Sequence, residues 1–90
     1  MKLIQSPRFK KDLKKLKGLP KKIAALQVVL GHLSLNGKLP IKYKPHMLEG
    51  KWKGYMECHV ENDFLLIWID EATDTIKLVR VGSHSDLFKK

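Results

Sequence analysis

The longest uninterrupted apolar run in the chain, F-L-L-I-W-I over Phe64–Ile69, most constrains how the chain can fold. Asn62 and Asp63 precede this run and Asp70 and Glu71 follow it, so polar residues limit it to strand length. A run of this length and composition is typical of a central β-strand. The rest of the chain must supply its neighbouring strands and a layer that covers them.

Three other segments have strand patterns. Met1–Gln5 predicts a short strand, Thr75–Val81 predicts a second strand that ends at Gly82, and Lys51–Asp63 predicts an extended strand that runs into a turn. The short gaps at 61–63 and 70–74 favour antiparallel hairpins over crossover connections.

Two amphipathic helices are predicted in the first half of the chain. Ser6 and Pro7 form an N-cap followed by proline at the first helical position, and the helix is expected to end at Gly18. A second helix is expected to start at Leu19-Pro20 and to end near Asn36-Gly37. Their apolar stripes consist of Phe9, Leu13 and Leu16 in the first helix and of Ile23, Leu26, Leu30 and Leu33 in the second.

These elements predict a single α+β domain over residues 1–90. The N-terminal strand and an antiparallel helical hairpin are expected to pack on one face of an antiparallel sheet. We expect the other face of that sheet to be left open.

The open face carries the chemistry, because side chains alternate along the strand predicted at Lys51–Asp63. Apolar side chains point to the core, and a phenol, a carboxylate and an imidazole point away from it, about 7 Å apart at ~3.3 Å per residue. An acid and a histidine on one surface indicate proton transfer. The outward set is Lys53, Tyr55, Glu57, His59 and Glu61, and the inward set is Met56, Cys58 and Val60.

The net charge of +9 is unevenly distributed. Residues 1–44 contain twelve Lys or Arg and one acid, a balance of +11, whereas residues 45–90 contain six Lys or Arg and eight acids, a balance of −2. This asymmetry favours a polyanionic partner, although a lysine-rich helix face can also serve solubility alone. The single cysteine, Cys58, excludes an internal disulfide, and no apolar run reaches the length of a signal peptide or a membrane span. We therefore expect a cytoplasmic protein.

Three of the four histidines, His46, His59 and His84, lie beside turns at predicted strand ends, where sites are often built. We assign no role to His32. Three histidines can bind zinc, but the chain has no H-x-x-x-H or C-x-x-C spacing, so we expect no metal and no other cofactor. Trp52 and Tyr55 can stack on bases; Trp52 has the parity of the core face and is expected to pack there.

Three motifs resemble the YafQ branch of the RelE superfamily of bacterial toxins. They are H-x-L-x-G-x-W-K-G-Y at His46–Tyr55, E-C-H-V-x-x-D at Glu57–Asp63 and G-S-H-x-x-L-F at Gly82–Phe88. The resemblance extends over essentially the whole chain. It implies a compact RelE-like ribonuclease fold, metal-independent cleavage of mRNA on the translating ribosome, and neutralisation by a cognate antitoxin. It also implies that the chain reaches operator DNA only through the antitoxin complex, and that the cytoplasm in question is bacterial.

The resemblance also implies the site residues. Five positions match the catalytic positions of the family: His46, His59, Asp63, His84 and Phe88. Glu57 is a sixth catalytic candidate, where the best-known members carry aspartate, so the charge is kept but the side chain is longer. Arg80 matches a phosphate-binding cation, and the other expected RNA contacts are Lys10, Lys11, Lys14, Lys15, Lys44, Lys53 and Tyr55.

Cleavage of RNA without a metal requires a base for the 2′-hydroxyl and an acid for the leaving 5′-oxygen. Histidines titrate near neutral pH and suit both tasks. We expect His84 to be the acid and either His46 or His59 to be the base, with Asp63 orienting an imidazole. Two alternatives remain: a non-catalytic, basic RNA-binding module, and an inactive relative that binds the antitoxin.

Overall fold

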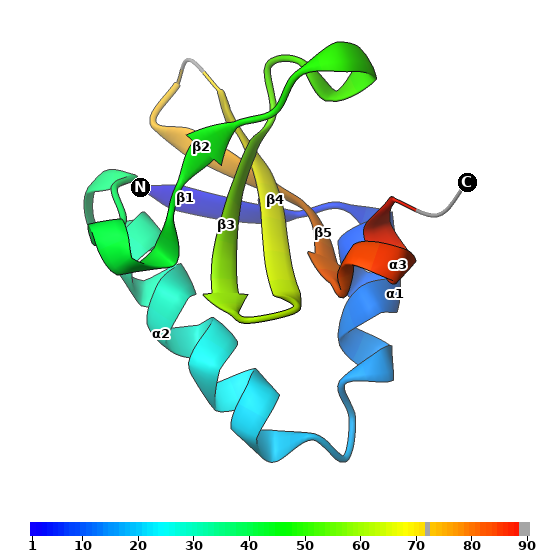
Figure 1. The fold of residues 1–90 in the computed structure, drawn as a ribbon. Helices are drawn as coiled ribbons and strands as arrows, with labels where there is room; N and C mark the ends of the chain where they lie inside the picture. The colour runs from blue at the N-terminus through cyan, green and yellow to red at the C-terminus, as the bar shows by residue number, and fades with distance from the viewer. Residues whose placement is uncertain (72, 89–90) are drawn as a thin grey trace.

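A computed structural model describes residues 1–71 and 73–88 of the chain (Figure 1). The strands are β1 (Lys2–Gln5), β2 (His46–Met47), β3 (Met56–Glu61), β4 (Phe64–Glu71) and β5 (Thr75–Gly82). The helices are α1 (Pro7–Lys15), α2 (Pro20–Asn36) and α3 (His84–Leu87), with the short 3₁₀ turns η1 (Ile41–Tyr43) and η2 (Gly50–Trp52). Among the helices in the described part of the chain, none has the length and apolar character that crossing a membrane requires.

Both long helices begin where the sequence predicts and α2 also ends there, but α1 ends at Lys15 and not at the predicted Gly18, because residues 16–18 form a turn. The Ser6 hydroxyl accepts a hydrogen bond from the amide of Phe9 and donates one to the carbonyl of Val79, so the N-cap of α1 is tied to β5. Pro7 and Pro20 occupy first-turn positions, and Gly37 ends α2 in the left-handed conformation. The helices diverge from their connection at residues 16–19 (Figure 1).

The strands form one five-stranded sheet in the order β1-β5-β4-β3-β2. The apolar run is β4 and lies at the centre, as predicted. The pairs β2–β3, β3–β4 and β4–β5 are antiparallel, but β1 pairs with β5 in parallel, from Lys2 opposite Thr75 to Gln5 opposite Leu78. The α+β class is therefore confirmed, and the expectation of a wholly antiparallel sheet is wrong at this edge. Short connections fix only neighbouring hairpins, whereas β1 joins the sheet next to the last strand of the chain.

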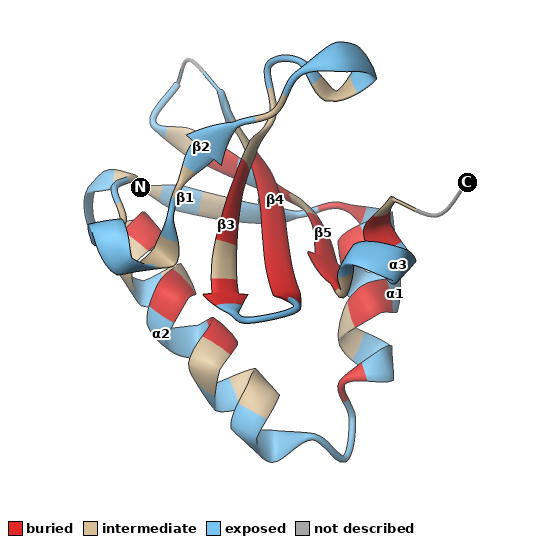
Figure 2. Cartoon of the chain, viewed as in Figure 1, coloured by how far each residue is buried: buried red, intermediate tan, exposed pale blue. Residues whose placement is uncertain are grey.

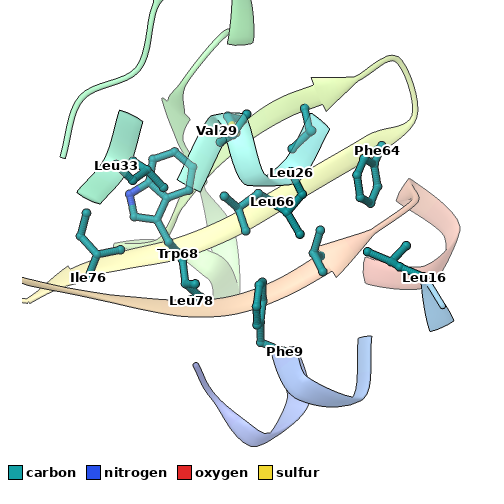
Figure 3. Close-up of a cluster of buried hydrophobic side chains, with 13 residues drawn as sticks. Phe9, Leu16, Leu26, Val29, Leu33, Phe64, Leu66, Trp68, Ile76 and Leu78 are labelled. Atoms are coloured by element: carbon teal, nitrogen blue, oxygen red, sulfur yellow. The ribbon is translucent and has the colours of Figure 1, made fainter. Parts of the chain in front are cut away.

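Both long helices cover one face of the sheet, and the main core lies between the helices and that face (Figure 3). Phe9 enters it from α1, Leu16 from the residue that follows α1, and Leu26, Val29 and Leu33 from α2. The inward residues predicted on β3 are confirmed, since Cys58 and Val60 are buried in this core and Met56 packs against it.

The other face of the sheet is not open, contrary to expectation. Leu65 and Ile67 of β4 are fully buried on it under Leu87 of α3, which explains why β4 is apolar at every position from Phe64 to Ile69 (Figure 2). Leu48, Trp52, Tyr55, Val79 and Phe88 pack around this second cluster. A pattern of single strands cannot show that a short helix and a loop fold back over the sheet.

The predicted strand over Lys51–Asp63 is too long at its start. Residues 50–52 form η2, and β3 begins only at Met56. Gly50 and Gly54 have φ angles of 69° and 96°, which lie outside the strand region and need glycine. Because the chain turns here, Trp52 and Tyr55 lie on the same face, with ring centroids 5.4 Å apart. Trp52 packs, as predicted, but on the opposite face from the one its parity indicates.

Candidate active site

Three histidines from separate segments meet along the second face of the sheet. His46 comes from β2, His59 from β3 and His84 from the first turn of α3. The ring centroids of His46 and His59 are 6.2 Å apart, and those of His59 and His84 are also 6.2 Å apart. His59 therefore lies between the other two rings, and the fold brings these three candidate site histidines together.

His84 is positioned by the start of α3. Ser83 and Asp86 form a capping box, in which the Ser83 hydroxyl accepts from the amide of Asp86 and the Asp86 carboxylate accepts from the amide of Ser83. The carboxylate of Asp63 accepts hydrogen bonds from both the amide and Nδ1 of His84, each at 2.9 Å. Asp63 thus orients the imidazole, as the sequence predicts, and leaves Nε2 of His84 directed elsewhere.

Hydrogen bonds also set the charge at this turn. The hydrogen bond from the His84 amide, followed by the one from its ring, lowers the pKa of Asp63 below its usual 3.8. The Ser83 hydroxyl and amide lower the pKa of Asp86 in the same way. Both carboxylates are therefore ionised at neutral pH.

His46 is held by two acceptors. Its Nδ1 lies 2.8 Å from the carbonyl oxygen of Lys44, and its Nε2 lies 3.2 Å from Oε1 of Glu57. The carbonyl can only accept, so Nδ1 carries a hydrogen in this arrangement. His46 and Glu57 therefore lie in contact at the edge of the sheet.

Glu57 is buried, with a relative exposure of 4%, although its parity predicted a solvent-facing side chain. Its Oε2 has no hydrogen-bond partner in the described part of the chain. Burial of an unpaired carboxylate oxygen is costly. The next residue, Cys58, is inert, because burial followed by the charge of Glu57 raises the pKa of its thiol to about 12.

Aromatic side chains pack beside the histidines. The Phe88 ring lies 6.1 Å from the His84 ring and 6.0 Å from the Trp52 ring, edge-on to the latter. One turn of helix thus brings His84 and Phe88 together. Tyr55 is half-buried against Trp52 in the second cluster, which leaves only part of its ring available to RNA.

Arg80 has a setting that the sequence did not predict. Its Nε and Nη2 donate to the carboxylate of Asp12 at 2.8 and 3.2 Å, and Asp12 also accepts from the amide of Val81 at 3.1 Å. The side chains of Arg80 and Asp12 are 11% and 4% exposed. The pair joins α1 to the end of β5, just before the turn that carries His84. The sequence did hold a sign that Asp12 is buried, because Asp12 is the sole acid in residues 1–44 and falls within the Phe9–Leu16 apolar stripe.

The lysines assigned to RNA binding are all exposed. Lys10, Lys11, Lys14 and Lys15 lie on the solvent side of α1, Lys44 lies just before β2, and Lys53 lies on the loop before β3. Lys53 borders a small pocket with Met47, Leu48 and Glu49. Over residues 1–71 and 73–88, no group of three or more His, Cys, Asp or Glu side chains is arranged to hold a metal ion.

Comparisons with known proteins agree with this geometry. Residues 1–89 match the family described as "Bacterial toxin of type II toxin-antitoxin system, YafQ". The mRNA interferase toxin YafQ of Escherichia coli K12 is 37% identical over 86 residues, which cover 92% of this chain and 90% of the relative. A metal-bound toxin from Helicobacter pylori superposes with a TM-score of 0.85 at 39% identity, over 98% of this chain and 99% of that one. The E. coli DinJ–YafQ complex gives a TM-score of 0.73 at 34% identity, over 96% of both chains.

Proposed function

The chain belongs to the YafQ family of type II toxins, and we propose that it is an endoribonuclease that cleaves mRNA on the translating ribosome. The observation that carries the proposal is the row formed by His46, His59 and His84, with an acidic partner at each end. In the proposed reaction the 2′-oxygen attacks the adjacent phosphorus, the bond to the 5′-oxygen breaks, and one proton moves from the nucleophile to the leaving group. The products are a 2′,3′-cyclic phosphate and a 5′-hydroxyl.

We assign the general acid to His84. Nδ1 of this ring donates to Asp63, so the proton on Nε2 of the imidazolium is the one available to the leaving 5′-oxygen. The carboxylate of Asp63 stabilises the cationic ring before transfer and fixes its orientation afterwards. Phe88 packs beside the ring and limits its rotation.

We assign the general base to His59 in preference to His46. In the described part of the chain neither ring nitrogen of His59 has a hydrogen-bond partner, so one of them is free to accept the 2′-hydroxyl proton. His46 is already held by Lys44 and Glu57.

The remaining cations have supporting roles. Arg80 uses Nε and Nη2 on Asp12, so we propose that only Nη1 reaches toward RNA. The exposed lysines of α1 attract the ribosome and its RNA. The proposed steps use side chains of the chain alone.

The proposed partners are a cognate antitoxin, the 70S ribosome and mRNA, in a bacterial cytoplasm. The E. coli DinJ–YafQ complex supports the antitoxin. Operator DNA would be reached only through that antitoxin.

The test is to incubate the purified protein with ribosome-bound mRNA and to map the RNA ends. We expect new 5′-hydroxyl and 2′,3′-cyclic phosphate ends inside the reading frame, and none with a His59→Ala, His84→Ala double variant. Binding of ribosomes without new ends would contradict the proposal and support a non-catalytic RNA-binding module.

A further inference from the structure

A surface pocket of about 380 Å³ opens beside His59. His59 and Val60 line it from β3, and Lys42, Tyr43 and Lys44 line it from η1 and the residue that follows. Its volume lies within the ~300–1,000 Å³ range of small-molecule sites. None of the mechanism above uses Lys42 or Tyr43, and neither residue stood out in the sequence.

The backbone that shapes the pocket also holds a histidine of the site. Lys44 has φ 51° and ψ 50°, a left-handed conformation that residues with a side chain adopt rarely. The same turn directs the Lys44 carbonyl to Nδ1 of His46 at 2.8 Å. Residues 42–46 therefore contribute both to the pocket and, through His46, to the row of histidines. Unusual backbone conformations of this kind cluster at functional sites.

The pocket has the chemistry of a nucleotide site. Lys42 and Lys44 are exposed and supply two ammonium groups, which attract a phosphate. The half-buried Tyr43 ring packs against the main core, with Nζ of Lys42 over it at 5.1 Å and the His32 ring centroid 6.0 Å from its own. Aromatic rings of this kind stack on unpaired bases of single-stranded RNA.

The surface on the other side of the β3–β4 turn has the opposite charge. A second pocket there is lined by three acids, Glu61, Asp63 and Asp86, and one base, Lys22. Glu61 also borders the first pocket, but its carboxylate is paired with Lys22 at 3.6 Å. A phosphodiester chain that crosses the histidines therefore meets attraction beside His59 and repulsion beside Asp63 and Asp86.

From this asymmetry we propose that the pocket beside His59 binds the mRNA nucleotide next to the cleaved phosphodiester. Its phosphate contacts Lys42 and Lys44, and its base or sugar lies against Tyr43. The inference rests on the proposed ribonuclease function and adds to it the path of the substrate. It makes Lys42, Tyr43 and Lys44 substrate-binding residues.

The variant that tests the pocket is a Lys42→Ala, Lys44→Gly double substitution. Glycine adopts positive φ without strain, so the carbonyl of residue 44 keeps its place at His46 while the ammonium is removed. The matched control is Lys2→Ala with Lys77→Ala. These two exposed lysines lie at the β1–β5 edge of the sheet, and their removal lowers the net charge by the same amount.

Single-turnover cleavage of ribosome-bound mRNA gives the first readout. We expect the pocket variant to raise the half-saturating toxin concentration ~10-fold, to leave the saturating rate within about twofold, and to lower the salt slope by about 0.7 for each lost phosphate contact. The control should resemble the wild type. Equal half-saturating concentrations and equal salt slopes in the pocket variant and the control would overturn the proposed binding of mRNA in the pocket. Absence of cleavage by the wild type would overturn the proposed function instead.

Nitrogen-15 NMR gives a second readout that needs neither the ribosome nor catalysis. In a His84→Ala background, adenosine and uridine 3′-monophosphates should shift the amides of residues 42–44 and 59, and the pocket variant should lose these shifts. Inorganic phosphate should bind more weakly than either nucleotide. Equal binding of phosphate and nucleotides would overturn the role of Tyr43, and shifts that lie elsewhere would overturn the site.

Discussion

At the scale of single residues, the contact between Asp63 and His84 links the chemistry of the site to its stability. The pKa of Asp63 is lower in the folded chain than its usual 3.8, so the folded state binds fewer protons near that pH. The stabilisation from this carboxylate is complete above about pH 4 and is lost as pH falls through the lowered pKa.

We therefore predict that Asp63→Asn destabilises the protein at pH 6 and that its difference from the wild type disappears in strong acid. Urea unfolding of both proteins between pH 2 and 6 measures this. Asp86 has a lowered pKa in both proteins, so its contribution cancels in the comparison. A difference that does not change with pH would contradict the prediction.

His84→Ala separates catalysis from folding. The His84 side chain is 57% exposed, so its loss should change the melting temperature by only a few degrees. We predict that single-turnover cleavage on the ribosome falls by at least ~10²-fold and that growth toxicity is lost while antitoxin binding persists. Near wild-type cleavage by the folded variant would leave the site to His46 and His59 alone.

The buried ion pair between Asp12 and Arg80 should instead affect folding stability. We predict that Asp12→Ala lowers the free energy of unfolding by about 3 kcal/mol, because it leaves the guanidinium of Arg80 without its buried partner. Asp12→Asn should cost less, since an amide oxygen still accepts from Val81. Asp70→Ala, at an exposed aspartate, is the control in the same denaturation experiment. Equal losses for Asp12→Ala and Asp70→Ala would show that the pair contributes nothing.

At the scale of elements, α1 has two faces with different roles. Phe9, Asp12 and Leu16 are buried toward the sheet, whereas the lysines of its outer face have no part in the core. The last turn of α1 carries Lys14 and Lys15, where positive charge also complements the helix dipole. A change confined to the outer face should therefore affect binding much more than folding.

We predict that Lys10→Glu, Lys11→Glu and Lys14→Glu together weaken binding to ribosomes and flatten its dependence on salt, because fewer counterions are released. The reversed charges should leave the far-ultraviolet circular dichroism and the melting transition close to wild type. Lys15 is left in place because its charge acts on Asp86 near the site. A folded triple variant with an unchanged salt slope would show that α1 does not meet the ribosome.

At the scale of the whole molecule, the described fold brings histidines to one edge without forming a metal site. We predict that the protein still cleaves ribosome-bound mRNA after exhaustive treatment of the protein with EDTA, when it is assayed on ribosomes kept intact with added magnesium. Loss of activity that zinc restores and magnesium does not would contradict acid–base cleavage by side chains alone.

The sequence by itself indicated the main helices and strands and named the candidate site residues. Proline and glycine signals fixed both ends of α2, the Phe64–Ile69 run placed β4 at the centre, and the motifs named the histidines that the fold brings together. These features depend on short-range preferences, which a reader of the chain can apply to a few residues at a time.

Only the tertiary structure decided what lies between distant segments. The parallel pairing of β1 with β5, the contact of the buried Glu57 with His46, and the pocket beside His59 each join parts of the chain that local patterns treat separately. Asp12 and Arg80 are 68 residues apart, and nothing in either neighbourhood specifies the other. Burial and long-range hydrogen bonding depend on which surfaces meet after folding, so the environment of each site residue could not be predicted although its identity could.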